Sequence, residues 1–401
     1  MWVADKLVYQ NESDFIRAYK GSEIVWVLPS GSYYIKWNPS SAEGQFNIDG
    51  TTYDLSAFGG LYYWSTGIIN ENAFSNNSTI QSIETNATEI YASAFQSCYS
   101  LSQINLPACS YIGYSTFGDC SSLSQISLPV CTHIGNYAFY NCKSLSQISL
   151  PKCSHIGWDA FRSCSSLLQI SLPVCTHIGT YAFCGCSSLS QISLPKCSSI
   201  GGHTFWRCFS LSQISLPKCS SIGDYAFHHC DSLSQISLPV CTYIGSNAFE
   251  FCYSLSQISL PKCSSIGEYT FNGCSSLLQI SLPKCSYIKD GVFQSCKSLS
   301  QISLPMCSSI GAFAFWSCYS LLQISLPKCS SIGRYAFEGC RSLSIITIGY
   351  SGVCSLSTSV FYNTQITSST GSIYVPASLV NTYKFASGWS QYSNRIFAIP
   401  S

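Results

Sequence analysis

The chain has 401 residues and a formal net charge of +1, and only 9% of its residues are charged, against roughly 25% in ordinary soluble domains. A charge balance this close to zero predicts no basic surface for nucleic acid. Its apolar runs are too short for a transmembrane helix, so we expect no membrane insertion. The opening segment, MWVADKLVYQNESDF, lacks the basic and apolar regions of a secretory signal.

Residues 1–65 are rich in Tyr, Trp and Gly and contain short alternating runs such as GSYYIKW, which predict a small β-rich module. Within it, the phrase AYKGSEIVW resembles short segments at the start of bacteriophage tail and virion proteins. This resemblance implies an attachment module, and a virion protein is expected to oligomerise through it.

Residues 66–347 consist of 22-residue copies, twelve strong ones and a weak one at Ile80 and Ile83. The spacing predicts a short strand that ends at Pro107, a tight corner at Gly113, and then a helical turn or a second short strand. One copy cannot bury its own apolar face, so parallel stacking into a solenoid of about 13 rungs is expected. The buried register of one copy is predicted to be Leu101, Ile104, Leu106, Cys109, Ile112, Phe117 and Cys120.

The pattern Leu101-x-x-Ile104-x-Leu106-x-x-Cys109 resembles the conserved segment of a leucine-rich repeat. The Ile-Gly, Phe and Cys positions that follow are similar to the BspA-like branch of that family. The resemblance implies adhesion to host surface proteins, matrix or glycans. These copies have 22 residues, where most members of the branch have 23.

Residues 348–401 contain GSIYVPASLVNTYKFASGWSQYSNRIFAI, which resembles the tail that closes many such arrays. We expect a strand and a short helix around Ala377 to Phe385. A solenoid needs both ends covered to avoid end-to-end stacking, so caps are predicted at both ends.

The 25 cysteines follow the repeat: twelve lie at 22-residue steps from Cys98 to Cys340, and eleven from Cys109 to Cys329. Disulfides, a metal ladder and packed free thiols are the alternatives. Parallel neighbours seldom offer the disulfide dihedral, so packed free thiols are favoured. Cys184 lies outside both series at a variable position, so we expect it to be exposed and the most reactive thiol.

Two outward columns are nearly constant. The Gln column that begins at Gln103 predicts either a hydrogen-bonded amide ladder or a flat surface for a regular polymer. The column after each Pro is mostly Lys and either discourages lateral sheet association or binds a polyanion. Its lysines are Lys152, Lys196, Lys218, Lys262, Lys284 and Lys328.

Two residues after each Phe, and the residue after each Cys of the first series, differ from copy to copy. Core positions would not accept Trp, Arg, Gly and Asp in turn, so these side chains are expected to project outward. Their aromatic and small polar types are typical of recognition surfaces, although drift at solvent positions is the alternative. The predicted ligand-binding residues are Trp158, Arg162, His203, Trp206, Arg207, Phe209, His228, His229, Phe251, Tyr253, Trp316 and Tyr319.

Candidate chemistry is sparse. His133, His155 and His177 share one column and are expected to stack about 5 Å apart, as an exposed polar column rather than a metal site. A His–Cys nucleophile formed by His228 or His229 with Cys230 is disfavoured because Cys230 belongs to the buried series. No phosphate loop, paired carboxylates, catalytic triad or zinc motif is present in the sequence, so no cofactor or catalysis is expected.

These observations predict a non-enzymatic recognition protein that binds a cell-surface protein or glycan. The N-terminal resemblance favours a phage tail-associated or prophage-borne protein located on the virion. A bacterial cell-surface adhesin and a structural spacer are the alternatives.

Overall fold

The computed structural model describes the backbone of seven strands between residues 2 and 69, and residues 70–400 except 79 and 369. Strands β3 and β4 are antiparallel, β4 pairs with β7 in parallel, and β5 and β6 form an antiparallel pair. The strands of this region are β1 (Trp2–Val3), β2 (Lys6–Leu7), β3 (Ile24–Val27), β4 (Tyr33–Trp37), β5 (Gln45–Ile48), β6 (Thr51–Asp54) and β7 (Gly60–Ile69). The side chains of the virion-like phrase lie outside the described residues, so its role stays a prediction.

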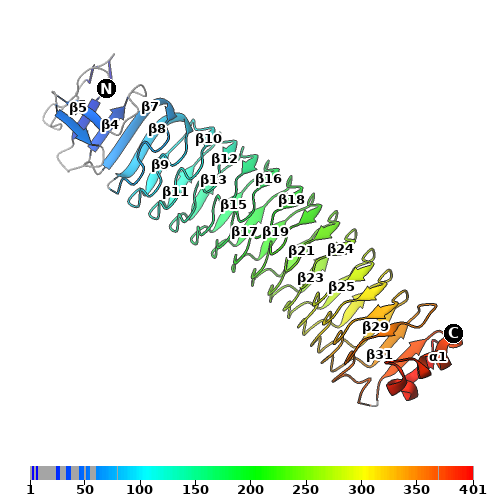
Figure 1. The fold of residues 1–401 in the computed structure, drawn as a ribbon. Coiled ribbons are helices and arrows are strands. Elements are labelled where there is room, and N and C mark those ends of the chain that lie inside the picture. The colour runs from blue at the N-terminus through cyan, green and yellow to red at the C-terminus, as the bar shows by residue number, and fades with distance from the viewer. Residues whose placement is uncertain are drawn as a thin grey trace. The chain divides into compact units, whose positions relative to one another are not determined.

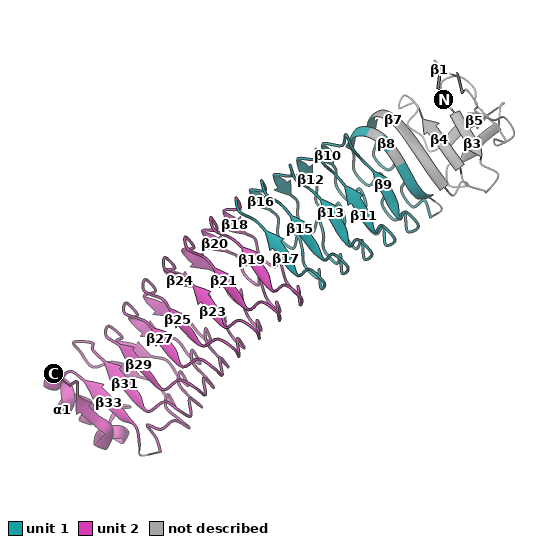
Figure 2. Ribbon diagram, turned by 180° about the vertical axis from the view of Figure 1, so that it is seen from behind, with its two compact units in different colours: residues 1–195 teal, residues 196–401 magenta. Residues whose placement is uncertain are grey.

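The chain divides into two compact units, residues 1–195 and 196–401, coloured separately in Figure 2. In each unit every 22-residue turn, here called a rung, contributes a longer and a shorter strand to two parallel columns (Figure 1). In unit 1 the longer strands are β8 (Ile80–Ile90), β9 (Gln103–Asn105), β11 (Gln125–Ser127), β13 (Gln147–Ser149), β15 (Gln169–Ser171) and β17 (Gln191–Ser193), and the shorter are β10 (Tyr111–Ile112), β12 (His133–Ile134), β14 (His155–Ile156) and β16 (His177–Ile178).

Unit 2 continues the same alternation. Its longer strands are β19 (Gln213–Ser215), β21 (Gln235–Ser237), β23 (Gln257–Ser259), β25 (Gln279–Ser281), β27 (Gln301–Ser303), β29 (Gln323–Leu326), β31 (Ile345–Ile348), β33 (Ser372–Val375) and β34 (Ile396–Ala398). Its shorter strands are β18 (Ser199–Ile200), β20 (Ser221–Ile222), β22 (Tyr243–Ile244), β24 (Ser265–Ile266), β26 (Tyr287–Ile288), β28 (Ser309–Ile310), β30 (Ser331–Ile332) and β32 (Ser355–Leu356).

The parallel solenoid predicted from the sequence is confirmed. Equivalent residues pair one rung apart, as Gln125 does with Gln147 and His133 with His155. The weak copy is also a rung, because β8 pairs with β9 near one end and with β10 near the other. In the described chain the longer column has six strands in unit 1 and nine in unit 2, which is two more than the expected 13 rungs, because β33 and β34 extend it.

The segment around each Phe is neither a helix nor a strand but a run of tight turns. Its N–H groups alternate between the next rung and the local chain: Phe117 N–H donates to the Ala138 carbonyl at 2.7 Å, and Cys120 N–H to the Phe117 carbonyl at 3.1 Å. This alternation places two residues per rung in the left-handed region, for example Ser115 at φ 49° and Asp119 at φ 61°.

The predicted buried register is confirmed. Leu101, Ile104 and Phe117 are all at most 5% exposed, and their equivalents repeat along both units. The Phe rings stack from rung to rung, with the centroids of Phe95 and Phe117 5.3 Å apart and their planes 2° from parallel. The Gln side chains of the strands point outward, but whether they form an amide ladder stays a prediction.

All 25 cysteines are buried free thiols, and most of those in the two series donate a hydrogen bond to a backbone carbonyl. In the first series the Sγ donates to the Phe carbonyl 25 residues earlier, as Cys120 does to Phe95 at 3.0 Å. In the second series the Sγ usually donates to the carbonyl two residues later, as Cys109 does to Tyr111 at 3.2 Å, whereas Cys285 donates to the Cys263 carbonyl at 3.2 Å. Burial raises the pKa of Cys109 to about 12 and that of Cys131 to about 11.

The prediction that Cys184 is exposed was wrong. Its side chain is 6% exposed, because the first position after each Phe lies against the neighbouring rungs and a small residue there is covered. A thiol at this position is shielded from reagents in the same way as the thiols of the two columns.

Gly113 and its equivalents are required by close approach rather than by their own dihedral angles. A Cβ on Gly135 would lie 2.6 Å from both the carbonyl carbon and the oxygen of Gly113 on the preceding rung. Each glycine therefore allows two rungs to stack at the spacing that their backbone hydrogen bonds require.

The C-terminal segment contains the strand β33, η3 (Ala377–Leu379), α1 (Val380–Phe385) and η4 (Ser390–Arg395), as the sequence predicted for its strand and helix. Trp389 is fully buried, and its Nε1 donates to the Cys354 carbonyl at 2.6 Å. The role of both termini as caps stays a prediction. Among the described residues no helix has the length and apolar character needed to cross a bilayer.

Replacing Gly135 with Ala should destabilise the protein by about 1–3 kcal/mol, because the new methyl group must displace backbone rather than a flexible side chain. Urea unfolding followed by circular dichroism would measure this. Ser149→Ala, on an exposed strand position, is the control. Equal stability of the Gly135→Ala variant and the native chain would contradict the close-approach argument.

Native protein at about pH 8 should react with almost none of its thiols within minutes, and with all 25 after unfolding in guanidinium. The reason is that every thiol is covered. Timed labelling with a maleimide and peptide mapping would check this, and rapid labelling of Cys184 would restore the original expectation for that residue.

Candidate recognition surface

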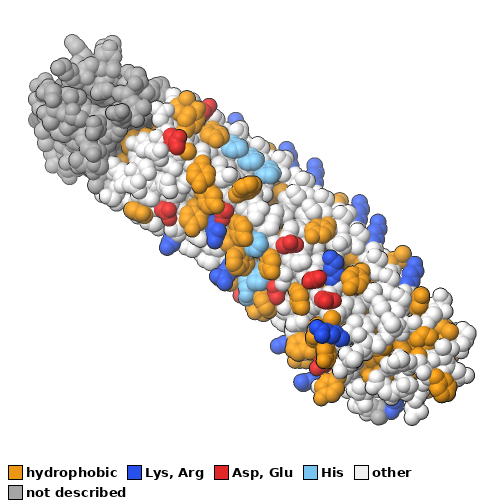
Figure 3. All heavy atoms as spheres, viewed as in Figure 1, with side chains coloured by type: hydrophobic (Ala, Val, Ile, Leu, Met, Phe, Trp, Pro, Cys, Tyr) orange, Lys and Arg blue, Asp and Glu red, His pale blue; other side chains and the backbone are white. Residues whose placement is uncertain are grey.

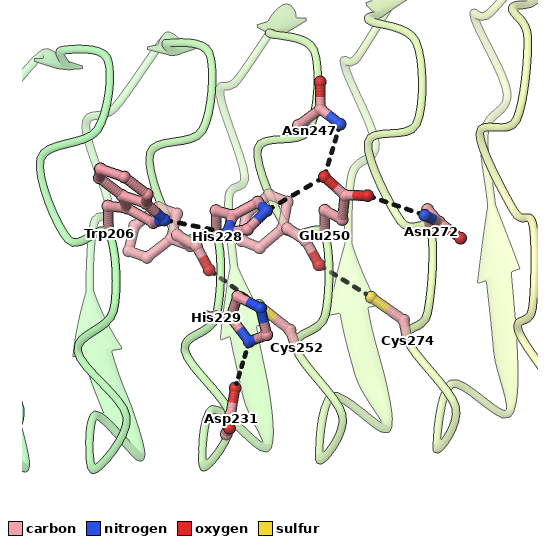
Figure 4. Close-up of polar contacts among 11 residues, drawn as sticks. Trp206, His228, His229, Asp231, Asn247, Glu250, Cys252, Asn272 and Cys274 are labelled. Carbon is pink, nitrogen blue, oxygen red and sulfur yellow. Dashed lines mark hydrogen bonds and ion pairs between the residues drawn. The ribbon is translucent and has the colours of Figure 1, made fainter.

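A chain of polar contacts joins four successive rungs of unit 2 (Figure 4). The Trp206 Nε1–H donates to His228 Nδ1 at 3.1 Å, and His228 Nε2 lies 3.2 Å from Glu250 Oε2. Asn247 and Asn272 donate their Nδ2 groups to the two Glu250 carboxylate oxygens at 2.6 and 2.8 Å. Trp206, His228, Glu250 and Asn272 are 22 residues apart, so the repeat itself brings them side by side.

This column is partly buried, which corrects the expectation that all variable side chains project outward. Glu250 and Asn272 are 9% and 8% exposed, and Trp206 is half-buried. Burial opposes ionisation of Glu250, but hydrogen bonds from His228, Asn272 and Asn247 outweigh it and lower the pKa of the carboxyl. The interior thus holds a carboxylate because its hydrogen bonds are satisfied.

The contacts of His228 leave it no free nitrogen for acid–base work. Because Trp206 donates to Nδ1, the ring proton is on Nε2, where it donates to Glu250. The neighbouring Cys230 donates its Sγ to the Phe205 carbonyl at 3.2 Å, and burial raises its thiol pKa well above the usual range. The arrangement positions Trp206 and does not activate a nucleophile.

A group of rings lies beside this network, in contact with His228. We call Phe209, His229, Phe251 and Tyr253 the aromatic cluster. The His229 ring centroid is 4.8 Å from that of Phe251, 6.1 Å from that of Tyr253 and 6.3 Å from that of Phe209. His229 Nδ1 lies 3.2 Å from Asp231 Oδ1, which fixes the ring orientation. Figure 3 shows hydrophobic and histidine side chains side by side on this face.

Further predicted residues surround the cluster. The His203 ring lies 5.5 Å from Trp206 and stacks on Tyr225 at 4.8 Å. The Arg207 guanidinium is 5.0 Å from the Trp206 ring. Eight predicted residues thus form one connected set: His203, Trp206, Arg207, Phe209, His228, His229, Phe251 and Tyr253.

The structure does not connect the other four to this set. Trp158 is 59% exposed in unit 1, and Arg162, also in unit 1, is held by Asp159 at 3.0 Å. Trp316 is half-buried rather than exposed, and Tyr319 lies under the guanidinium of Arg341 at 4.9 Å.

Sequence reasoning missed Glu250, Asn247, Asn272 and Asp231. The signal was present in the 22-residue step, since Glu250 and Asn272 follow Trp206 and His228 in one column. Treating residues 22 positions apart as spatial neighbours, and asking which of them can form hydrogen bonds, would have found the network.

The backbone under the cluster has the left-handed conformation that recurs on every rung. Arg207, His229 and Phe251 have φ of 60°, 57° and 60°, and the equivalent residue on the next rung is Gly273. Non-glycine residues in this region cost about 1–2 kcal/mol each, so the stack of rungs must hold them there.

In unit 1, three histidines stack as predicted. The ring centroids of His133 and His155 are 4.3 Å apart and those of His155 and His177 4.4 Å, and Tyr111 extends the stack at 5.2 Å. They belong to the paired strands β12, β14 and β16, and Figure 3 shows pale blue histidine side chains in a row. Burial, together with the neighbouring His133 and His177, lowers the pKa of His155 to about 4. In the described residues no three His, Cys, Asp or Glu side chains converge as a metal site.

His155 should make the protein less stable in mild acid. Its pKa is lower folded than unfolded, so the unfolded chain takes up the proton first, and stability falls as the pH drops from 6.5 towards 4. The expected loss is on the order of 1 kcal/mol after allowance for solvent screening of the half-buried ring. His155→Ser, a residue already found in this column at Ser199, should reduce the pH dependence of Tm over this range. If the pH dependence of Tm were the same in the variant and the native chain, His155 would not be the source of the acid destabilisation.

Comparisons with known proteins bear on the fold. The family described as "BspA type Leucine rich repeat region (6 copies)" matches overlapping segments: 64–168, 111–219, 154–278, 198–321 and 264–387. No curated protein matches the chain.

Two solved structures illustrate the likeness. A leucine-rich repeat protein from Bacteroides ovatus is 25% identical, with a TM-score of 0.70, over 98% of this chain and 100% of that one. A leucine rich cell surface protein from Faecalibacterium prausnitzii is 21% identical, with a TM-score of 0.34, over 97% of this chain and 100% of that one. Since the family match extends over residues 64–387, more than half of the sequence, the chain belongs to the BspA-type leucine-rich repeat proteins.

Proposed function

We propose that this protein is a non-enzymatic recognition protein that binds a cell-surface protein or glycan through the aromatic cluster of unit 2. The observation that carries the proposal is the contact between exposed rings and a buried polar network. Phe209 and Tyr253, each 42% exposed, flank the His229–Phe251 pair, and both rings of that pair contact His228 of the hydrogen-bonded network. Drift at solvent positions has no reason to produce a buried carboxylate with three matched donors beside exposed rings.

The network favours binding because it fixes the contact surface in advance. Ordering side chains costs about 0.5–1.5 kcal/mol each when a complex forms. Here His228 is held between Trp206 and Glu250, and His229 is held by Asp231. Rigid aromatic rings of this kind supply contact area at low entropic cost.

Two settings suit this role, a bacterial cell surface and a phage tail-associated particle. The second rests on the resemblance of AYKGSEIVW alone. The recognition proposal is the same in both, because it uses only unit 2. A structural spacer would use the length of the array and would have no need of the cluster.

The double variant Phe209→Ser/Tyr253→Ser should weaken binding at least about tenfold, since each substitution removes a large exposed ring from the proposed contact surface. Serine already occupies this column at Ser187 and Ser275, so the fold should be kept. The measurement is binding of the labelled full chain to a panel of bacterial cells, purified glycans and matrix proteins.

The matched control is Tyr99→Ser/Tyr319→Ser, which removes two rings from the same column on other rungs. Loss with the first pair alone would support the aromatic cluster. Equal loss in both, or loss in neither, would move the binding face elsewhere, and no binding by the native chain to the whole panel would favour the spacer.

A further inference from the structure

A column of lysines lies in unit 2 on the turn after each Pro, away from the aromatic cluster. All five are exposed, and none makes an ion pair among the described residues. The column reads two lysines, an apolar residue, two lysines, an apolar residue and a lysine: Lys196, Lys218, Val240, Lys262, Lys284, Met306 and Lys328.

The charge of the chain is divided unevenly between the two units. Unit 2 holds 12 of the 19 Lys and Arg but 6 of the 18 Asp and Glu, a balance of +6, and unit 1 holds the other 7 and 12, a balance of −5. The overall charge of +1 therefore hides a basic half. Figure 3 shows blue side chains spaced along one edge of this half, with no red ones among them on the face shown.

Protection of a strand edge does not explain these lysines. Several strands of unit 2 are paired on both sides, as β23 is with β21 and β25, yet lysines follow these strands too, at Lys262 and Lys284. The lysines lie on the turn that follows the strand and not within it. Positive charges at a regular spacing attract a partner whose negative charges recur at a similar spacing.

A column of hydroxyl groups runs beside the lysines, two residues further along each rung. Five of them donate their proton to the carbonyl of the same column on the preceding rung: Ser220, Thr242, Ser264, Ser308 and Ser330, with Ser220 reaching Ser198 at 3.0 Å and Ser308 reaching Ser286 at 2.8 Å. Because that proton is used, the exposed lone pairs remain as acceptors for a partner's O–H groups.

We propose that this lysine column binds a linear acidic polysaccharide, laid along the rungs of unit 2. Successive rungs are about 4.8 Å apart, close to the advance of one sugar ring, so neighbouring lysines meet carboxylates or sulfates on neighbouring sugars. The hydroxyl column accepts hydrogen bonds from sugar hydroxyls. A nucleic acid fits less well, because the column contains no Arg for bidentate phosphate contacts and exposed rings stand beside it only at Tyr243 and Tyr287.

The test measures binding of the full chain to polygalacturonate and to dextran sulfate by biolayer interferometry at several salt concentrations. Both should bind, with affinity falling steeply as salt rises. Lys262→Val/Lys284→Val, which introduces a residue native to the column, should weaken binding at least about tenfold and reduce the salt dependence. Lys262→Arg/Lys284→Arg should keep it.

Lys297→Ser/Lys143→Ser is the matched control, since it removes the same charge from another column where serine occurs naturally. Loss of binding in this control equal to that in the valine variant would overturn the proposal, as would equal binding of neutral dextran. Tighter binding of poly(dT) than of either polysaccharide would replace it with a nucleic-acid site. The Phe209→Ser/Tyr253→Ser variant should bind the polysaccharides normally, so this result is independent of the aromatic cluster.

Discussion

Backbone hydrogen bonding between neighbouring rungs is the constraint on which the rest of this structure depends. It fixes the distance between equivalent residues, and that distance explains three features at once. A Cβ does not fit at Gly135, the Phe rings stack at 5.3 Å, and each first-series thiol reaches a carbonyl of the rung before it. The side chains of the core fill a space that the backbone has already defined.

The same constraint explains why the scaffold and the surface can vary separately. Within a rung, the Leu, Ile, Cys and Phe positions contact their own copies on either side, so a change there is felt along the column. The positions around Arg207 and His229 are joined to the next rung through their backbone, since Arg207 N–H donates to the His228 carbonyl at 2.9 Å and His229 N–H to the Glu250 carbonyl at 3.0 Å. They accept many residue types even though their backbone is left-handed, because the paired turns on either side hold them in place.

Much of the fold could be predicted from the spacing of apolar residues, because in a repeat array each residue contacts the equivalent residues of the neighbouring copies. Leu101, Ile104 and Phe117 had to be inside if a 22-residue copy was to bury anything. The errors arose where depth depends on side-chain size. Cys184 is covered because its side chain is small and the neighbouring side chains are larger. Trp206 is half-buried because it donates a hydrogen bond to His228, which in turn contacts Glu250. The sequence of a single copy predicts neither the burial of Cys184 nor that of Trp206. Comparing equivalent positions across copies shows that Trp206, His228 and Glu250 are neighbours, which explains part of the burial of Trp206.

The Trp206–His228–Glu250 network also bears on how such an array changes over generations. Nearly identical copies invite unequal recombination, which adds or removes whole rungs. Most of the array would tolerate the gain or loss of a rung, since the core residues of any copy can stack on those of any other. An extra copy between Trp206 and Glu250 would separate residues that must be adjacent to form the network. We therefore expect the number of copies between residues 206 and 272 to be constrained, while copies on either side can be gained or lost.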